Sequence, residues 1–524
     1  MTNSRIFFWS LVSALAGFLF GFDTVVISGA EQTIQSLWNL SPATHGLVMA
    51  SALYGTVLGS IIGGWPTDRF GRKKTLLWIG VLYFVSAVWS GLAKDPWSFI
   101  IARFIGGLGV GICTVTAPLY ISEISPPERR GRLAGMFQFN IVFGILIAFL
   151  SNWLLKDIGE NAWRWMLGVE AFPAALYSLL CFTIPESPRW LLARKGDREA
   201  GLAVLRLINR GASAAEISKA AADIVAASSQ STSASGFWSA RLRVPILLAF
   251  LVAFFNQLSG INAILYFAPR IFGLTGSENA LAQSVGIGIT NLIFTYVGLW
   301  LIDRLGRRTL LAIGSFGYIA SLGLCAVAFF AWAPQFRAAS KAVDVRAIAG
   351  QLETANPARQ EALAKEFAAV QKALVEATAN PRAGTTPVQI PTNATVAQVK
   401  DAAGMALQQA SSAAGAGGMM VLVCIFAFIA AHAIGQGAVI WVLISEIFPN
   451  RYRAAGQALG SFTHWIFAAL LTQFFPLMIA AFAPGAIFLF FCGMMVLQLI
   501  WVKTMVPETK GVPLEEMEKK LGIA

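Results

Sequence analysis

Apolar runs of about 20 residues alternate along the chain with short polar segments. Runs of this length suit α-helices that cross a lipid bilayer, because a helix rises about 1.5 Å per residue and the hydrocarbon core is about 30 Å thick. Strands of a membrane barrel would instead show short segments of alternating polarity. The pattern predicts an all-α membrane protein with about twelve transmembrane helices. They begin near Ile6, Thr44, Thr75, Trp97, Leu133, Trp165, Val244, Leu281, Thr309, Gly418, Ala455 and Pro484.

Two polar motifs occur twice within this pattern. GGWPTDRFGRKK at 63–74 returns as GLWLIDRLGRRT at 298–309, and SEISPPERR at 122–130 returns as SEIFPNRYR at 445–453. Repeated loops between equivalent apolar runs are typical of transporters that are built from two related halves. We therefore expect two pseudo-symmetric halves of roughly six helices each.

The two repeats have different offsets, 235 residues for the first and 323 for the second, so about 88 residues are inserted in the second half. We assign residues 1–186 to the N-terminal half and 187–240 to a helical linker, where Ser213 and Glu216 form a capping box. Residues 241–524 form the C-terminal half, and the insertion occupies about 337–417, between helices 9 and 10.

The insertion predicts two helices of its own. Asn356 and Pro357 begin the first, whose apolar stripe comprises Leu363, Phe367, Val370 and Leu374. Thr395 and Gln398 form the capping box of the second. Two interpretations remain open: a lid that docks an unknown partner, or an insertion that an exposed loop tolerates.

The positive charges are concentrated in alternate loops. Arg and Lys follow the second, fourth and eighth spans, whereas residues 31–45 and 480–485 contain none. Because basic loops stay in the cytoplasm, this pattern places both termini inside the cell, in the cell (inner) membrane. The net charge of +12 is then a topology signal, and we expect lipid rather than nucleic acid around the protein.

The motifs DRFGRKK, SEISPPERRGR, PESPRW, SEIFPNRYR and PETKG occur in this order on the predicted loops. In this combination the chain resembles the sugar porter family of the major facilitator superfamily over nearly its whole length, apart from the insertion. PESPRW together with PETKG is the more specific part, since DRxGR alone occurs across the superfamily. The resemblance implies the major facilitator fold and transport of a sugar.

The charged motif residues predict a latch between the halves. Ion pairs of Asp68 with Arg130, Glu123 with the first arginine cluster and Glu446 with the second would close the inner gate and break when it opens. The alternative is that the basic residues only set the topology. The predicted gating residues are Asp68, Arg69, Arg72, Glu123, Arg130, Glu186, Arg189, Asp303, Arg304, Glu446, Arg453 and Glu508.

Asp23 lies inside an apolar span, where a carboxylate is costly unless it is paired or used. Counting residues along the two helices places Arg103 at a similar depth, so we expect the two side chains to meet. Protonation of Asp23 in an open state and its return to Arg103 on closure would couple proton entry to the conformational change. In sugar porters that resemble this chain, an acid here accompanies proton symport. The alternative is a permanent structural ion pair.

A sugar requires amides, indoles and an apolar surface, because its hydroxyls both donate and accept hydrogen bonds. The resemblance assigns such residues to the sugar site position by position, although transmembrane amides also join helices to one another. The predicted binding residues are Phe20, Gln138, Asn256, Gln257, Asn262, Tyr266, Asn291, His432, Gln436, Gly437, Trp441, His464 and Trp465.

Three positions depart from the family pattern. Ala438 follows Gly437 where the family has proline, so we expect a less broken helix there. His432 and His464 replace an aromatic residue and an amide, and the spacing puts His432 and Gln436 on one helix face. The two histidines either tune substrate choice and pH response or bond to neighbouring helices.

We expect a proton-coupled symporter of a monosaccharide, a hexose or a pentose, that works by alternating access. A passive uniporter is the nearest alternative, and a sugar sensor or a membrane enzyme are further ones. The sequence contains no HExxH or GxSxG motif and no metal-like spacing among its five cysteines, so we predict no catalytic residue, no metal and no cofactor. The expected partners are a small sugar, a proton and membrane lipid.

Overall fold

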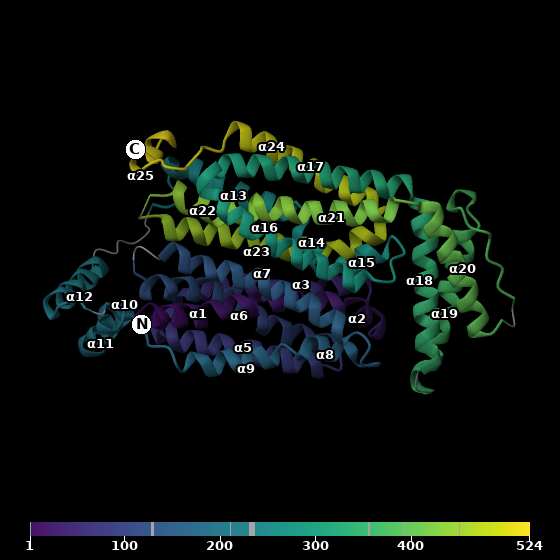
Figure 1. Cartoon of the computed structure of the whole chain (residues 1–524), viewed down its shortest axis with the longest axis horizontal. Coiled ribbons are helices and arrows are strands. Elements are labelled where there is room, and N and C mark those ends of the chain that lie inside the picture. The colour runs from purple at the N-terminus through teal and green to yellow at the C-terminus, as the bar shows by residue number, and fades with distance from the viewer. Residues whose placement is uncertain are drawn as a thin grey trace.

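The computed structural model describes residues 2–126, 130–209, 211–229, 236–354, 357–391, 394–449 and 451–523. These residues form helices and no strands, which confirms the all-α prediction. Among them, eleven helical segments are long and apolar enough to cross a membrane. The long helices lie side by side in two layers, with the C-terminal half stacked on the N-terminal half (Figure 1).

The N-terminal half contains six spans. The first five are α1 (Thr2–Val26), α3 (Pro42–Ile62), α5 (Arg72–Leu92), α6 (Pro96–Ile124) and α7 (Arg130–Leu155). The sixth is divided into α8 (Ala162–Gly168) and α9 (Ala171–Cys181), each shorter than a single membrane crossing. Short helices α2 (Glu31–Leu37) and α4 (Gly64–Phe70) connect the first three spans.

The C-terminal half repeats this arrangement with more interruptions. Its first span is divided into α13 (Arg243–Leu258), α14 (Ile261–Tyr266) and α15 (Ala268–Gly273). The next two are α16 (Ala280–Leu305) and α17 (Arg307–Ala331). The fourth consists of α21 (Gly417–Ile434) and α22 (Gln436–Ile447), and the last two are α23 (Arg453–Ala481) and α24 (Pro484–Thr504).

The divided helix around Gly435 corrects one prediction. We expected Ala438 to leave this helix less broken, yet α21 ends at Ile434 and α22 begins at Gln436. Gly435 adopts φ −87° and ψ −99°, which lies outside helical geometry. The break therefore arises two residues before Gly437 and needs no proline.

The ends of the bundle differ. The end that holds both termini, called the termini end below, carries the linker helices α10 (Pro188–Trp190), α11 (Arg198–Ile208) and α12 (Ala214–Ser229), and the C-terminal α25 (Leu514–Lys520) (Figure 1). The opposite end, called the insertion end, carries α18 (Ala333–Thr354), α19 (Pro357–Thr378) and α20 (Val396–Ala414), which cross the bundle direction (Figure 1). Both predicted capping boxes are present, at Ser213–Glu216 and Thr395–Gln398.

The insertion contains three long helices, not the predicted two. Helix α18 follows α17 with only Trp332 between them, and Pro334 in its first turn was the local signal of its start. The predicted stripe on α19 is confirmed, since Leu363, Phe367 and Leu374 are buried in a core that the insertion forms by itself. Asn356, the predicted start of α19, lies outside the described residues.

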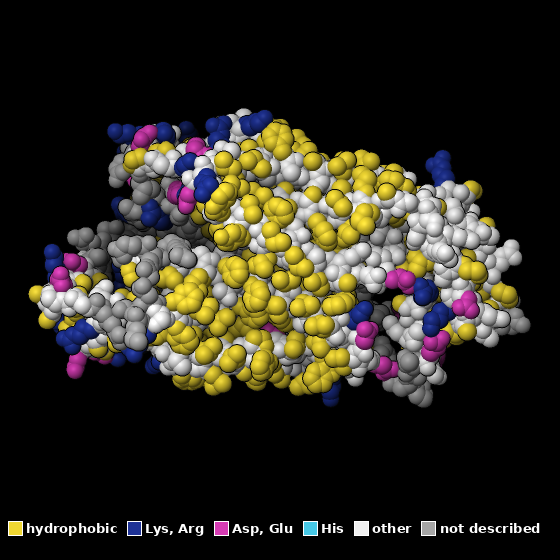
Figure 2. Space-filling view, in the orientation of Figure 1, with side chains coloured by type: hydrophobic (Ala, Val, Ile, Leu, Met, Phe, Trp, Pro, Cys, Tyr) yellow, Lys and Arg dark blue, Asp and Glu magenta, His cyan; other side chains and the backbone are white. Residues whose placement is uncertain are grey.

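The surface carries a broad apolar belt over the long helices, with charged side chains gathered at the two ends (Figure 2). Large side chains in this belt, such as Trp78, Phe172 and Tyr296, are more than half exposed. Such a surface is unfavourable in water and favourable in lipid, which is the environment of an integral membrane protein with several spans.

Candidate functional site

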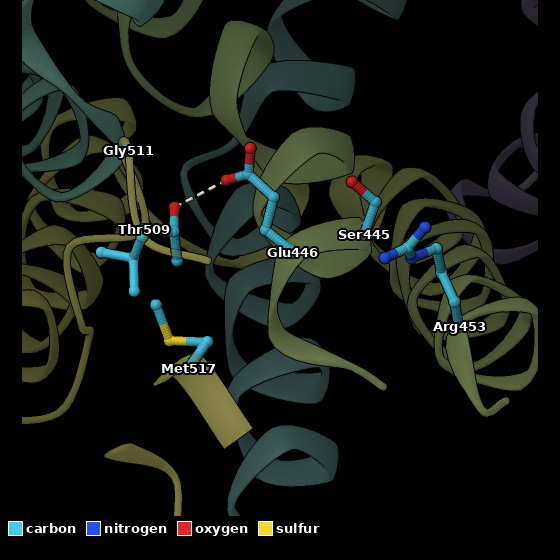
Figure 3. Close-up of a pocket in the computed structure, with 7 residues that line it drawn as sticks. Ser445, Glu446, Arg453, Thr509, Gly511 and Met517 are labelled. Carbon is cyan, nitrogen blue, oxygen red and sulfur yellow. Dashed lines mark hydrogen bonds between the residues drawn. The ribbon is translucent and has the colours of Figure 1, made fainter. Parts of the chain in front are cut away.

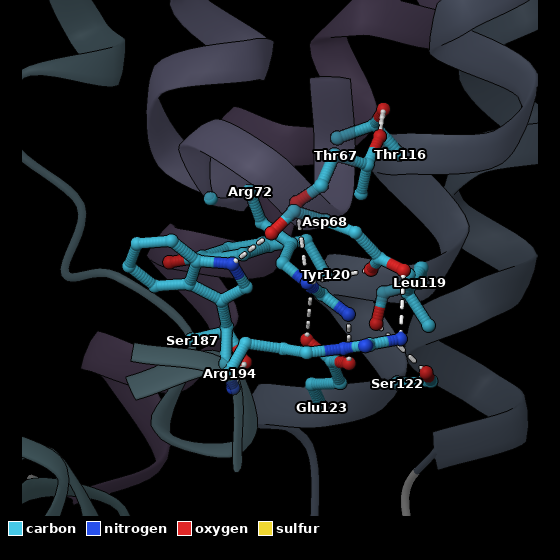
Figure 4. Close-up of polar contacts among 12 residues, drawn as sticks. Thr67, Asp68, Arg72, Thr116, Leu119, Tyr120, Ser122, Glu123, Ser187 and Arg194 are labelled. Atoms are coloured by element: carbon cyan, nitrogen blue, oxygen red, sulfur yellow. Dashed lines mark hydrogen bonds and ion pairs between the residues drawn. The ribbon is translucent and has the colours of Figure 1, made fainter. Parts of the chain in front are cut away.

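A charged network occupies the termini end of the N-terminal half (Figure 4). Arg72 forms two hydrogen bonds with Glu123, at 2.9 Å from Nε and 3.0 Å from Nη2. Its Nη1 also donates to the Thr67 carbonyl and to Asp68, each at 3.2 Å. Asp68 accepts a further bond from Arg194 of the linker at 3.0 Å. Arg72 therefore joins α4, α5 and α6 into one unit.

Glu186 completes this unit from the PESPRW segment. Its carboxylate accepts the backbone N–H groups of Arg72 at 2.9 Å and Lys73 at 3.2 Å, which are free donors in the first turn of α5. Burial raises the pKa of Glu186 above its usual value, although the N–H groups of Ser187, Lys73 and Arg72 oppose the shift. Gly71 precedes α5 at φ +92°, and a Cβ there would lie 2.3 Å from a Glu186 oxygen.

The C-terminal half builds the same unit from the second copies of the motifs. Arg307 binds Glu446 at 3.0 and 2.8 Å, and it also donates to the Ile302 carbonyl and to Asp303. Glu508 accepts the backbone N–H groups of Arg307 at 2.9 Å and Arg308 at 3.1 Å. The pseudo-symmetry that the repeats predicted therefore extends to individual hydrogen bonds.

A pocket of about 280 Å³ lies beside Glu446 (Figure 3). Thr509 Oγ1 donates to Glu446 at 2.6 Å from one side, while Ser445 and Arg453 lie on the other side. The half-buried Arg453 belongs to the predicted gating set.

In this conformation the predicted latch does not join the halves, and its role as a gate stays a prediction. Glu123 and Glu446 do pair with the first and second arginine clusters, but each pair lies within one half and does not tie the halves together. The reason is the turn at each repeated motif, which directs Arg72 to the Thr67 carbonyl and Arg307 to the Ile302 carbonyl of the same half. The side chain of Arg130 lies outside the described residues, and Asp68 pairs with Arg72 and Arg194. Arg69, Arg189 and Asp303 are exposed, and Arg304 stacks on Trp300.

Asp23 and Arg103 meet as predicted, and both are about 1% exposed. Arg103 Nη1 donates to Asp23 Oδ1 at 2.5 Å, and Nη2 donates to the Asp23 carbonyl at 2.8 Å. Tyr266 belongs to α14 of the opposite half, which packs against α1, the helix that carries Asp23. A buried ion pair of the N-terminal half thus lies next to a divided helix of the other half.

Glu170 is a member of this cluster that the sequence analysis missed. It lies at the junction of α8 and α9, is 1% exposed, and interacts with both Asp23 and Arg103. Among the described residues, Glu170 Oε1 and Asp23 Oδ2 have no hydrogen-bond partner. The signal was available, because Glu170 is an acid within an apolar span, as Asp23 is. Asp23 therefore holds the guanidinium of Arg103, and Glu170 places a second carboxyl group beside the same buried pair.

A second cluster, of amides and aromatic rings, lies where the halves meet. Gln257 donates to Asn256 at 2.9 Å and accepts from Asn262 at 2.7 Å, and its Nε2 lies 3.1 Å from His464. The Trp441 ring is tilted against the His464 ring and the Trp465 ring meets it edge-on, at centroid distances of 5.2 and 4.7 Å. Trp465 also contacts Phe20 of the N-terminal half at 5.5 Å. Seven predicted sugar-binding residues are therefore brought together.

The remaining predicted residues differ in their surroundings. Gln436 is fully buried, and neither atom of its amide has a partner among the described residues. His432 bonds Tyr318 of α17 at 2.6 Å, which favours the role of a helix-joining residue, and the break at Gly435 separates it from Gln436. Asn291 bonds weakly to Thr295 at 3.4 Å. Gln138 is half-buried, and Gly437 packs against His432.

Residues 9–350 and 394–521 match the family described as sugar (and other) transporter. The chain is 31% identical to the arabinose-proton symporter of Bacillus subtilis (strain 168), over 97% of this chain and 94% of that protein. It is 29% identical to the D-xylose-proton symporter of Escherichia coli (strain K12), over 98% and 96%. Its fold is similar to the inward-open structure of the xylose transporter from E. coli, with a TM-score of 0.71, 28% identity, and coverage of 98% of this chain and 99% of that one. The family and its structural neighbours are transporters rather than enzymes. The chain therefore belongs to the sugar porter family of the major facilitator superfamily.

Proposed function

We propose that this protein is a proton-coupled symporter that carries a monosaccharide by alternating access. The observation that carries the proposal is the buried Asp23–Arg103 ion pair, with Glu170 and Tyr266 beside it. Two acids and one guanidinium leave a negative charge without a partner unless one acid holds a proton, so this cluster is suited to bind and release protons. The two relatives named above as sugar-proton symporters support the same function.

Sugar binds in this proposal at the amide and aromatic cluster. Gln257, Asn262 and Gln436 supply donors and acceptors for sugar hydroxyls, while Trp441 and Trp465 supply an apolar surface. Phe20 brings the N-terminal half to the same place, so a bound sugar would contact both halves. Binding energy can then differ between the states of the cycle.

The conformation is interpreted as open toward the cytoplasm, with the termini end inside the cell. The charge pattern of the loops supports this orientation. At the insertion end the halves contact each other directly, since Tyr54 of α3 bonds Gln473 of α23 and Arg270 of α15 bonds Glu31 of α2. At the termini end, the ion pairs of Arg72 and Arg307 each lie within one half, and Arg194 of the linker binds Asp68 of the N-terminal half.

Uptake by proteoliposomes tests the proposal. Labelled pentoses, hexoses and polyols are offered with and without an inward proton gradient, to wild type and to Asp23→Asn. A gradient of about 1 pH unit would support up to roughly tenfold accumulation for one proton per sugar. We expect accumulation in wild type, and exchange without accumulation in Asp23→Asn. Equal uphill loading by both proteins contradicts coupling through Asp23, and equilibration without accumulation in wild type identifies a uniporter.

A further inference from the structure

A second buried charge network joins the halves at the insertion end. Glu31 of α2, fully buried, accepts two bonds from Arg270 of α15, at 2.7 Å from Nε and 2.8 Å from Nη2. Gln35 accepts a further bond from Arg270 at 2.5 Å, and His45 of α3 lies 3.3 Å from Glu31. Glu31 and Gln35 of the N-terminal half thus hold one arginine of the C-terminal half, and His45 lies against Glu31.

This network must come apart when the insertion end opens. Alternating access separates α2 and α3 from α15, and Arg270 then leaves the carboxylate that neutralises it. A charge that loses its partner in a buried site is strongly unfavourable, so the open state requires a replacement partner or water. The partner that Arg270 finds in the open state therefore contributes to the free-energy difference between the closed and the open states.

The inserted helix α18 supplies a candidate replacement. Burial alone would lower the pKa of Arg270, but Glu31 and, after it, Asp344 of α18 raise this pKa above its usual value. Asp344 forms an ion pair with Lys341 at 2.7 Å. The Asp344 side chain is 39% exposed, so water reaches its carboxylate. Its partner Lys341 competes with Arg270 for the same carboxylate.

Helix α18 is fixed to the half that carries Arg270. It follows α17 directly, and Ala339 packs on Gly276 in the loop after α15, where φ is +79° and a Cβ would lie 2.3 Å from Ala339 Cβ. Arg346 of α18 forms an ion pair with Glu278 of the same loop. The inserted helices also have their own core, so Asp344 would move with Arg270 when the halves separate.

We propose that the insertion is part of the gate at the insertion end, and that Arg270 exchanges Glu31 for Asp344 as this gate opens. The proposal rests on the alternating-access part of the proposed function. It gives the inserted helices a role within the transport cycle, because Asp344 lowers the energy of the open state. It also predicts that substitutions of Asp344 and of Lys341 have opposite effects on the opening of this gate.

Distances between spin labels test the exchange in the full chain, reconstituted in lipid without sugar. Labels on the exposed positions Gln32 and Asn279 report the separation of the halves at the insertion end. We expect Asp344→Asn to reduce the long-distance population severalfold. Lys341→Met should raise it, because it frees Asp344 for Arg270, and Glu31→Gln should raise it further.

Asp401→Asn, an exposed change on α20 of the same insertion, is the matched control and should leave the distribution unchanged. If Asp344→Asn and Lys341→Met also leave it unchanged, the exchange is wrong. Glu31→Gln removes the buried partner of Arg270 and could prevent folding. In that case Asp344→Asn and Lys341→Met, which change partly exposed side chains, decide between the two outcomes. Sugar uptake is a separate readout, so a missing proton dependence in uptake would not alter the distance result.

Discussion

Glu186 and Glu508 perform the same task in opposite halves of the protein. Each carboxylate accepts the first backbone N–H of a helix, Arg72 for Glu186 and Arg307 for Glu508, at 2.9 Å in both cases. In both halves the helix is preceded by a glycine, Gly71 or Gly306, with φ near +90°. The repeated motifs therefore encode a structural unit in which glycine, arginine and glutamate depend on one another.

Gly71→Ala should destabilise the protein by about 1–3 kcal/mol, because alanine is strained at positive φ and its Cβ would displace the Glu186 carboxylate. Thermal unfolding in detergent measures the change. Gly493→Ala is the matched control, since its Cβ meets nothing within 4 Å inside helix α24. The control should be neutral or stabilising by up to about 1 kcal/mol, owing to the better helix propensity of alanine.

Gln436→Leu should weaken sugar binding without harming the folded protein. The amide is buried and has no partner among the described residues, so removing it costs no hydrogen bond in the sugar-free state. Loss of one or two bonds to a sugar hydroxyl corresponds to about 1.5–3 kcal/mol, a rise in Kd of at least roughly tenfold. Calorimetric titration with the transported sugar gives the Kd. An unchanged Kd would show that Gln436 does not contact the sugar.

His432→Phe separates the two interpretations of this histidine. Because His432 bonds Tyr318 at 2.6 Å, we expect loss of about 1–2 kcal/mol in stability and little change in the sugar profile. Tyr318→Phe, which removes the same bond from the other side, should cost a similar amount. A changed sugar profile in His432→Phe together with an unchanged one in Tyr318→Phe would instead assign His432 to substrate selection.

The gate pair at the insertion end should resist acid. Burial alone would raise the pKa of Glu31, but Arg270 and His45 lower this pKa from 4.5 to about 2. A lowered folded-state pKa adds stability that is fully present above the unfolded value and is lost as the pH falls toward the folded value. The stability difference between wild type and Glu31→Gln should therefore stay constant from about pH 8 to about pH 5 and shrink between about 4.5 and about 2. Chemical unfolding at a series of pH values measures this difference, and a difference that already shrinks above about pH 5 would contradict the lowered pKa of Glu31.

The membrane architecture could be predicted because its signals are local. Bilayer thickness dictates the length of each apolar run, and the repeated motifs mark equivalent loops. The pairing of Asp23 with Arg103 could be predicted from depth alone, since buried charges need partners and helix rise is constant. Glu170 carried the same signal as Asp23 and could have been found by the same reasoning.

Other features depend on how helices face one another. Counting along the chain indicates that Glu123 binds an arginine of the first cluster, but not that the resulting bond to Arg72 stays within one half. Likewise, α18 follows α17 after only Trp332, and the break at Gly435 occurs where its backbone packs closely on Gly314 and needs no proline.

The sequence by itself determined the solvent, the number of spans, the two-half repeat and the presence of buried acids, because each follows from hydrophobicity and spacing along one helix. The tertiary structure alone decided which charges meet across helices: Glu170 beside Asp23, and Glu31 with Arg270 beneath an inserted Asp344. The physical reason is that an ion pair depends on distances of a few ångströms between segments that are far apart in the chain, and only packing sets those distances.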